Sequence, residues 1–329
     1  MIQISQFGAG RIGRMHALNL ARHPAYRLRW VVDVHEPSAR AVAKATGAEV
    51  ADTERALADP SIDAVLIASS TDTHADLIEA AARAGKAILC EKPIDLSRSR
   101  VDACLKVVEE AGVPLMIGFN RRFDANFRAV RRAIADGRVG NVEMVAITSR
   151  DPGPPPPEYI KVSGGLFRDM MIHDFDLARW LLGEEPSEVM ASGSCLVDPA
   201  IGELGDIDTA MVVLRTPSGR LAQISCSRRA SYGYDQRLEV LGSKGMARAE
   251  NVKLSTVEIA DAEGMHGEKP PHFFIERYAS AYIAELDHFA ACLERGEAPS
   301  PSGDDGRRAL ALADAALASQ ASGRTVAPS

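Results

Sequence analysis

The sequence predicts an α/β protein in which a doubly wound parallel sheet is followed by an α+β domain with a large, open, mostly antiparallel sheet. Two observations lead to this fold class. Short apolar strands alternate with helical segments over residues 1–120, and strand-like runs dominate from residue 188 to about residue 260. Because 329 residues exceed the usual size of one domain, we divide the chain into residues 1–120 and residues 121–329.

The first domain consists of strand–helix units with short connections, which is the pattern of a parallel sheet. Gly85 and Gly112 directly follow two of its helical segments and supply the usual signal for a helix C-terminus. The expected elements are strands at 2–7, 27–34, 49–50, 63–68, 87–90 and 114–119, and helices at 11–23, 37–46, 73–84 and 97–111.

The second domain begins with a helix and a strand and then changes character. Residues 151–158 (Asp-Pro-Gly-Pro-Pro-Pro-Pro-Glu) are too rich in proline for a helix or a central strand, so we expect an extended, stiff loop. Later strands are joined by turn signals such as Pro217-Ser218-Gly219, which favour an antiparallel sheet. The expected elements are helices at 124–135, 166–182, 275–293 and 304–318, and strands at 142–149, 189–197, 209–215, 220–227, 236–241, 247–250 and 257–260. For the last two helices, packing against the first domain stays open as an alternative.

The composition excludes several classes of function. The chain has 45 acidic and 38 basic side chains, and this net charge of −7 argues against nucleic acid as the main partner. It holds no run of about 18 apolar residues that could span a membrane, and its N-terminus resembles a strand rather than a secretion signal. Five cysteines without a Cys-x-x-Cys pair fit a reducing compartment, so we expect a cytoplasmic protein without a metal.

Gly8-Ala9-Gly10-Arg11-Ile12-Gly13 matches the pattern G-x-G-x-x-G between the first strand and the first helix, which predicts a Rossmann-type dinucleotide-binding loop. Gly8 would allow the tight turn, Gly10 would let the backbone approach the pyrophosphate, and Gly13 would let the helix lie close to the sheet. The phosphates would rest on the N–H groups at the helix N-terminus.

Asp33 follows Gly13 by about 20 residues, at the end of the second strand, and indicates which dinucleotide binds. A carboxylate there accepts hydrogen bonds from the ribose hydroxyls and repels a 2′-phosphate, so it favours NAD over NADP. Arg11 and Arg14 weaken this preference, because either could meet a 2′-phosphate. The alternative is an ordinary turn followed by an ordinary aspartate at a strand end.

Lys92, within Glu91-Lys92-Pro93 at the end of a short strand, is a candidate for substrate binding. Ligands bind at the carboxyl edge of such a sheet, and a lysine there can hold a hydroxyl and stabilise the alkoxide formed on oxidation. The tripeptide alone favours the alternative, an exposed lysine before a proline turn.

Asp169 and His173 lie four positions apart in the predicted helix 166–182, which places them on one face. This helix is apolar on most sides and should be buried, so the two polar groups need partners or a ligand. His173 can accept a hydroxyl proton near neutral pH, and Asp169 can orient it. The alternatives are a satisfied core histidine and, for Asp176, a structural pair with Arg179. No third metal ligand is evident.

These motifs, in this order, resemble the Gfo/Idh/MocA family of NAD(P)-dependent sugar and polyol oxidoreductases, and the resemblance covers essentially the whole chain. Within the family, the chain is most similar to the inositol dehydrogenases. The stretches that carry this similarity are 118–124 (Gly-Phe-Asn-Arg-Arg-Phe-Asp), 159–176 (Tyr-Ile-Lys-Val-Ser-Gly-Gly-Leu-Phe-Arg-Asp-Met-Met-Ile-His-Asp-Phe-Asp) and 227–236 (Ser-Arg-Arg-Ala-Ser-Tyr-Gly-Tyr-Asp-Gln).

The resemblance implies a catalytic triad of Lys92, Asp169 and His173. His173 would take the hydroxyl proton, Lys92 would bind the reacting oxygen, and Asp169 would support the proton transfer while the hydride passes to NAD. It also implies a homotetramer built by the sheet of the second domain, and a substrate pocket bordered by residues 151–158. The expected cofactor contacts are Gly8, Gly10, Arg11, Ile12, Gly13, Asp33, Ser69, Thr71, His74, Glu91 and Lys92; the expected substrate contacts are Lys92, Asn120, Arg121, Asp169, His173, Tyr232 and Tyr234.

The expected function is NAD-dependent oxidation of a ring hydroxyl of myo- or scyllo-inositol to the corresponding inosose. Two alternatives stay open: a dehydrogenase of an aldose such as glucose, and an NAD-dependent glycosidase of similar fold, which would release no NADH. A third, a non-catalytic sensor of NAD or sugar, is disfavoured because a sensor needs no proton acceptor such as His173.

Overall fold

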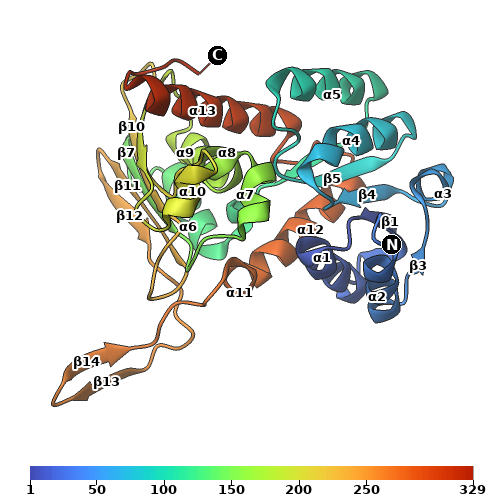
Figure 1. Ribbon diagram of the computed structural model, residues 1–329, viewed down its shortest axis with the longest axis horizontal. Coiled ribbons are helices and arrows are strands. Elements are labelled where there is room, and N and C mark those ends of the chain that lie inside the picture. The colour runs from blue at the N-terminus through green and yellow to red at the C-terminus, as the bar shows by residue number, and fades with distance from the viewer. Residues whose placement is uncertain (329) are drawn as a thin grey trace. The chain divides into compact units, whose positions relative to one another are not determined.

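The computed structural model describes residues 1–328, and the chain forms two compact units (Figure 1). The first unit contains residues 1–123 and 280–310, and the second contains residues 124–279 and the chain from residue 311 onward. Part of the C-terminal region therefore belongs to the first unit, although it follows the second in sequence. Among the described residues, no helix is both long enough and apolar enough to cross a membrane.

The first unit is built on a six-stranded sheet with the order β3-β2-β1-β4-β5-β6, in which every neighbouring pair is parallel. The chain runs outward from β1 in one direction and then from β4 in the other, so the strand order reverses between these two strands. The predicted doubly wound sheet is confirmed, and ligands bind at such a reversal point. The strands are β1 (Ile2–Phe7), β2 (Tyr26–Val32), β3 (Glu49–Val50), β4 (Ala64–Ile67), β5 (Ala87–Glu91) and β6 (Leu115–Gly118).

Helices pack on this sheet in two pairs, one beside the outer strands β2 and β3 and the other beside β4 and β5. The first pair is α1 and α2, and the second is α4 and α5. Strand β4 is completely buried along its length, which explains its uninterrupted apolar sequence. The helical elements are α1 (Arg11–Arg22), α2 (Glu36–Thr46), α3 (Thr53–Ala58), η1 (Thr71–Thr73), α4 (His74–Arg83), α5 (Arg98–Ala111), η2 (Asn120–Phe123), α12 (Ala279–Arg295) and the beginning of α13 (Gly303–Ser322).

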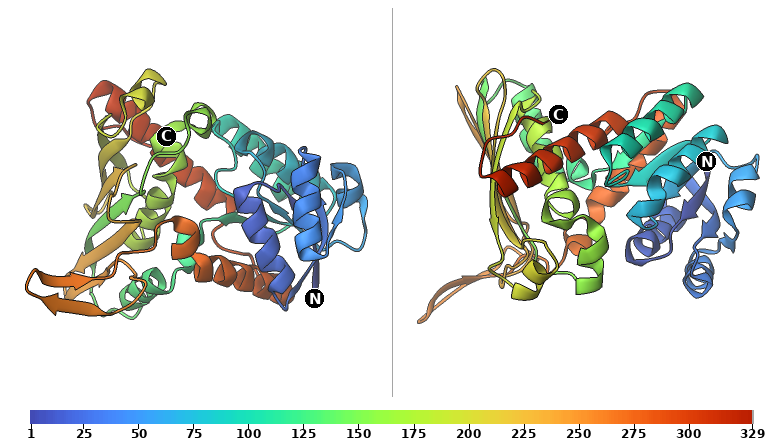
Figure 2. Two further views of the ribbon diagram at one scale, coloured as in Figure 1. Left: turned by 60° about the horizontal axis from the view of Figure 1, so that its bottom comes forward. Right: turned by 45° about the horizontal axis from the view of Figure 1, so that its top comes forward.

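The second unit contains a six-stranded sheet with the order β12-β11-β7-β10-β9-β8. Only β7 and β10 pair in parallel, so the predicted, mostly antiparallel sheet is confirmed. Burial alternates along β9, and α9 packs on β7 and β10 (Figure 2). The strands are β7 (Val142–Arg150), β8 (Glu188–Ser194), β9 (Thr209–Arg215), β10 (Leu221–Ser227), β11 (Asp235–Gly242) and β12 (Gly245–Ala249); the helices are α6 (Ala125–Ala135), α7 (Pro157–Ser163), α8 (Gly165–Asp169), α9 (Ile172–Leu182), α10 (Pro199–Glu203) and α11 (Phe274–Arg277).

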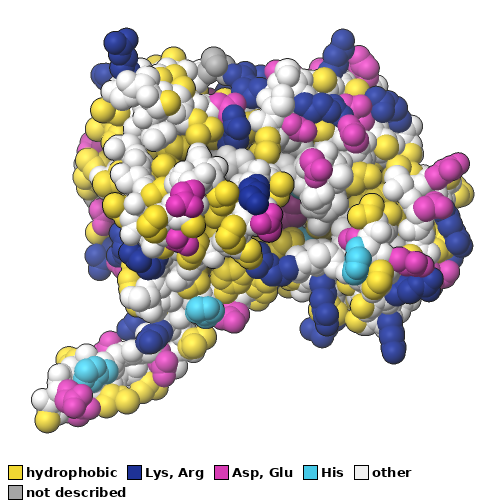
Figure 3. All heavy atoms as spheres, in the orientation of Figure 1, with side chains coloured by type: hydrophobic (Ala, Val, Ile, Leu, Met, Phe, Trp, Pro, Cys, Tyr) yellow, Lys and Arg dark blue, Asp and Glu magenta, His cyan; other side chains and the backbone are white. Residues whose placement is uncertain are grey.

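The strand predicted at 257–260 does not join this sheet. It forms β13 (Glu258–Asp261), which pairs only with β14 (Gly264–Gly267) in a separate two-stranded ribbon. Every residue of both strands is exposed, and Figure 3 shows hydrophobic and histidine side chains along this projecting hairpin. A tight local turn ending at Gly264 lets the chain pair with itself, and this local pairing replaces the expected addition to the sheet.

Two other predictions, one of a helix and one of a loop, have wrong boundaries. The helix expected at 275–293 is divided at Tyr278 into α11 and α12. The predicted loop 151–158 ends earlier than expected, because Pro157 opens α7 at a position where a proline costs no hydrogen bond.

Candidate active site

The loop between β1 and α1 needs glycine at two of its three motif positions. Gly8 has a φ of +100°, and a Cβ there would overlap the carbonyl of Ala68 at the end of β4. A Cβ on Gly13 would overlap the carbonyl of Gly8. The sequence predicts a tight turn at Gly8 and close packing of the helix at Gly13. The backbone geometry requires glycine at both positions.

Gly10 differs from both, because a Cβ on it would meet no atom within 4 Å. It precedes α1 without capping it by a side chain, and no acidic residue lies in the first turn among the described residues. The first N–H groups of the helix, at Arg11 and Ile12, thus border open space at the positive end of the helix dipole. This cradle fits the pyrophosphate of a dinucleotide.

Gln6 is a residue of this site that the sequence did not single out. Its buried amide nitrogen donates to the carbonyl oxygens of Gly8 at 2.8 Å and Gly13 at 2.7 Å. Gln6 therefore clamps both ends of the glycine loop. A polar residue in an otherwise apolar buried strand is the signal that could have identified it.

Asp33 lies directly after β2, beside the same loop. One carboxylate oxygen accepts a hydrogen bond from the backbone N–H of Ala9 at 2.6 Å, and the other accepts from His35 at 2.7 Å. Each carboxylate oxygen has a second lone pair, so Asp33 can still accept bonds from ribose hydroxyls. The residues of this unit thus fit NAD.

The segment after β4 is tied to the segment after β5 by His74. One ring nitrogen, Nδ1, lies 2.8 Å from the carbonyl oxygen of Pro93, and Nε2 lies 3.2 Å from that of Ser69. Burial lowers the pKa of His74, so the ring is neutral near pH 7 and donates mainly to Pro93. Ser69 also bonds Thr73 at 2.7 Å, across η1, which contains Thr71. His74 therefore joins the two segments that follow β4 and β5.

Lys92 follows the last residue of β5, and the Lys92–Pro93 peptide is cis. Glu91 turns inward and binds Nε2 of His16, on α1, at 2.7 Å. Because successive side chains of an extended chain point to opposite sides, Glu91 anchors the strand end while half-buried Lys92 is presented beyond it. His16 is a second residue of this site that the sequence missed.

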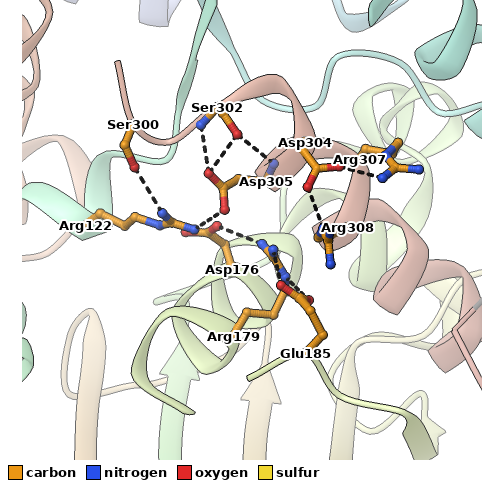
Figure 4. A network of polar contacts seen from close by, with 10 residues as sticks. All are labelled: Arg122, Asp176, Arg179, Glu185, Ser300, Ser302, Asp304, Asp305, Arg307 and Arg308. Carbon is orange, nitrogen blue, oxygen red and sulfur yellow. Dashed lines mark hydrogen bonds and ion pairs between the residues drawn. The ribbon is translucent and has the colours of Figure 1, made fainter. Parts of the chain in front are cut away.

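Asn120 and Arg121 lie in η2, directly after β6, and both are buried. Figure 4 shows how this turn is fixed: Arg122 donates to Asp305 at 2.8 Å, and Asp305 accepts from the backbone N–H of Ser302 at the same distance. The first unit therefore gathers the glycine loop, Ser69, Lys92 and η2 at the carboxyl ends of four parallel strands.

In the second unit, Asp169 and His173 do not share one continuous helix. The predicted helix 166–182 is interrupted at Met170 and Met171, so Asp169 ends α8 and His173 lies in the first turn of α9. Both methionines keep right-handed helical backbone angles, and the two residues stay on consecutive turns. At the other end, α8 begins at Gly165, which has a φ of +82° and is separated from α7 by Gly164.

The carboxylate of Asp169 contacts Tyr159 and Arg228. The hydroxyl of Tyr159, on α7, donates to Oδ1 at 2.9 Å, and the guanidinium of Arg228 lies 3.8 Å from Oδ2. Neither partner was singled out from the sequence, because both contacts depend on how distant segments pack. Asp176 plays the structural part considered for it: it pairs with Arg179 at 3.7 Å, and Arg179 also binds Glu185 (Figure 4).

The two tyrosines expected at the substrate have different surroundings. Tyr232 is partly exposed, and its hydroxyl donates to Asp235 at 2.6 Å; burial and this carboxylate raise its pKa. Tyr232 also lines an open groove of about 550 Å³ at the base of the β13–β14 hairpin. Tyr234 is buried, and its ring lies edge-on to that of Tyr278 at 6.0 Å. Neither Asp169 nor His173 lines that groove.

Comparison with known proteins identifies both units. Residues 2–119 match the oxidoreductase family with an NAD-binding Rossmann fold, and residues 127–248 match the GFO/IDH/MocA C-terminal domain. The inositol 2-dehydrogenase of Rhizobium meliloti (strain 1021) is 55% identical over 326 residues, which are 99% of this chain and 98% of that protein.

Solved structures give the same assignment. A myo-inositol dehydrogenase from Corynebacterium glutamicum matches with a TM-score of 0.96 at 44% identity, covering 100% of this chain and 99% of that one. A scyllo-inositol dehydrogenase from Lactobacillus casei, with NAD(H) and scyllo-inositol bound, matches with a TM-score of 0.92 at 28% identity over 99% of both chains. On these matches and on the glycine loop, the chain belongs to the Gfo/Idh/MocA family of oxidoreductases.

Proposed function

We propose that this chain oxidises a ring hydroxyl of myo- or scyllo-inositol to the inosose, with NAD as the hydride acceptor. The observation that carries the substrate class is the 55% identity, across nearly the whole chain, with a protein named inositol 2-dehydrogenase. The glycine loop with its open side at Gly10, and Asp33 beside it, support the cofactor.

The chemistry of the reaction assigns one role to each of three residues. NAD, when bound, supplies the hydride acceptor. Lys92 holds the reacting oxygen and stabilises the negative charge that develops on it. His173 takes the hydroxyl proton, since an imidazole titrates close to neutral pH. Asp169, held by Tyr159, orients the imidazole and offsets the charge it acquires.

The remaining expected contacts divide between cofactor and substrate. Arg11, Ile12, Ser69, Thr71, His74 and Glu91 would border the dinucleotide, either directly or by fixing the loops that do. Asn120, Arg121, Tyr232 and Tyr234 would contribute polar groups for the other ring hydroxyls. The hydroxyl of Tyr232 donates to Asp235 and accepts from Arg150 at 3.1 Å, and these two bonds fix its orientation.

We also propose that the open face of the second sheet builds a homotetramer. Leu221, Met144, Leu241 and Met246 are exposed and lie side by side on four neighbouring strands. A continuous apolar row of this kind on a sheet face is typical of a protein interface. We place the enzyme in the cytoplasm, a location that fits its five cysteines in the thiol form.

A substrate panel tests the proposed reaction. Purified protein is mixed with NAD and with inositols, aldoses or glycosides, and NADH formation is followed by absorbance. We expect NADH with myo- or scyllo-inositol. Turnover of aldoses alone would reassign the substrate, and glycoside cleavage without NADH would indicate a glycosidase. No reaction with any of them would refute an oxidoreductase role for this site.

Variants test the assigned roles in the same assay. Lys92→Ala and His173→Ala should each lower kcat by about 100-fold or more while NAD binding is retained. Lys106→Ala removes an exposed side chain of the same type as Lys92 and serves as a matched control. Full activity of Lys92→Ala or His173→Ala would contradict the role assigned to that residue.

A further inference from the structure

Arg228 is the largest side chain of this protein with less than 2% exposure, and it lies directly after β10. Its guanidinium lies between two carboxylates: one terminal nitrogen is 3.8 Å from Oδ2 of Asp169, and the other is 3.5 Å from Oδ2 of Asp206. A fully buried charge is costly unless opposite charges accompany it. The position of Arg228 is therefore a specific arrangement rather than a chance surface pair.

Asp206 holds the opposite end of the helix that carries Asp169. Its Oδ1 accepts a hydrogen bond from the backbone N–H of Leu166 at 3.0 Å, in the first turn of α8. Gly165 makes this approach possible, since a Cβ at that position would lie 2.7 Å from Oδ1 of Asp206. Arg228 thus bridges the carboxylate at the start of α8 and the carboxylate at its end.

The backbone of Arg228 is itself fixed. Its N–H donates to the carbonyl oxygen of Asp208 at 2.8 Å. The carboxylate of Asp208 in turn accepts three backbone N–H bonds, at 2.8 to 3.0 Å, from Leu196, Val197 and Asp198. The guanidinium is therefore carried by a rigid segment. Arg228 needs this rigidity in order to set the position of another side chain.

We propose that Arg228, together with Asp206, is a positioning residue for the oxidation: it holds the Asp169 carboxylate in the orientation that His173 needs. This inference rests on the proposed function. Around Asp169, the Tyr159 hydroxyl lies at Oδ1 and Arg228 at Oδ2, Asp206 lies across the guanidinium, and His173 follows on the next turn. Neighbouring Arg168 turns away to Asp314.

The physical effect of removing Arg228 follows from this geometry. Without the guanidinium, the part-buried carboxylates of Asp169 and Asp206 lose the positive charge between them, and Asp169 loses the partner that fixes Oδ2. A displaced Asp169 withdraws its support from His173. A loss of alignment of this kind lowers kcat, with a much smaller effect on the binding of NAD.

The experiment is a double-mutant cycle in the inositol assay, using wild type, Arg228→Met, Asp169→Asn and the double variant. Arg228→Met keeps the length of the side chain and removes its charge, and we expect kcat to fall about 10- to 100-fold with the KM for NAD nearly unchanged. Arg228→Lys should restore part of the loss. Arg229→Met, which changes the exposed neighbour, is the matched control.

The double variant separates positioning from a general structural role. If Arg228 acts through Asp169, Arg228→Met should cost little in the Asp169→Asn background. An equal loss in both backgrounds would overturn the proposal, and so would full activity of Arg228→Met. If Arg228→Met does not fold, the same cycle with Arg228→Lys decides, since its loss should likewise disappear in the Asp169→Asn background.

The proposed function can fail independently of this inference. If wild type oxidises no inositol, the thermal unfolding of the same four proteins still measures the coupling between Arg228 and Asp169. Additive changes in melting temperature would then overturn the proposed link between Arg228 and Asp169. Non-additive changes would keep that link and leave only the reaction to be reassigned.

Discussion

The hydroxyl of Tyr159 donates a hydrogen bond to Oδ1 of Asp169, with 2.9 Å between the two oxygens. Tyr159 lies on α7, which Pro157 opens after the proline-rich segment, and Asp169 ends α8. Gly164 joins the two helices with a φ of +83°, a left-handed turn that brings α7 back beside α8. The proline-rich segment is thereby connected, through one hydrogen bond, to a residue of the proposed proton transfer.

Removing this hydroxyl should slow the reaction without unfolding the protein. Tyr159→Phe deletes one hydrogen bond to a charged acceptor, and because the ring is partly exposed we expect a loss in kcat of about 10-fold at most. Steady-state kinetics with inositol measures it. Val162→Ala, an exposed change on the same helix, is the control. Equal kcat values for Tyr159→Phe and wild type would show that Asp169 does not need this bond.

The glycine loop offers a test that separates cofactor binding from folding. Gly10 has an ordinary φ of −69°, and a methyl group there meets only open space, so Gly10→Ala should keep the melting temperature and weaken NAD binding. Gly13→Ala should lower the melting temperature, because its Cβ would overlap the Gly8 carbonyl. Calorimetric titration with NAD and thermal unfolding measure the two effects. Unchanged NAD affinity in Gly10→Ala would place the pyrophosphate elsewhere.

Asp33 should decide between the two nicotinamide dinucleotides. Asp33→Ala removes the carboxylate that repels a 2′-phosphate and leaves Arg11 and Arg14 nearby in sequence, so the preference for NAD should shrink. The measurement is the ratio of kcat/KM for NAD and NADP. Because Asp33 also accepts the N–H of Ala9, both absolute values should fall somewhat. A ratio equal to that of wild type would mean that other residues select the cofactor.

Local sequence patterns were sufficient to predict the parallel sheet of the first unit and its glycine loop. A completely buried parallel strand needs a short apolar run, and a tight strand-to-helix turn needs glycine at fixed positions. Both requirements are met within a few consecutive residues, at β4 and at residues 8–13. The antiparallel strands of the second sheet could also be predicted from the sequence. Because one face of the sheet is buried, apolar and polar residues alternate along such strands.

The surroundings of the candidate site could not be predicted in the same way. Arg228 and Tyr159 reach Asp169, and Asp206 reaches Arg228, from three separate segments, so these contacts depend on packing between distant parts of the chain. The interruption of the helix at Met170 has no local signal either, since neither glycine nor proline marks it. The β13–β14 hairpin shows the opposite case. There a local turn pairs β13 with β14, whereas the sequence predicted that the strand would join the large sheet.

Glu285, in the first unit, has an unusual environment for a carboxyl group. It lies on α12 and is completely buried, and neither carboxyl oxygen has a hydrogen-bond partner within residues 1–328. Burial first, and the charge of Glu91 second, raise its pKa well above the usual value. The folded protein therefore keeps a proton on Glu285 at a pH where the unfolded chain has released it.

The sign of the effect on stability follows from this difference. A raised pKa in the folded state means that the folded form binds more protons, so the contribution of Glu285 is complete below about pH 4.3 and is lost as pH rises. Glu285→Gln cannot ionise and does not suffer this loss. The free energy of unfolding of Glu285→Gln, relative to that of wild type, should therefore increase by up to about 1.4 kcal/mol per pH unit above pH 5.

Denaturant unfolding between pH 5 and pH 8 measures this gain. The difference between variant and wild type is the relevant quantity, because the glutamine amide has hydrogen-bonding needs of its own that shift the variant by a constant amount. Glu294→Gln changes an exposed glutamate on the same helix and should give a difference that does not depend on pH. If the curves for Glu285→Gln and wild type run parallel over this range, then Glu285 is charged in the folded protein, which contradicts the prediction.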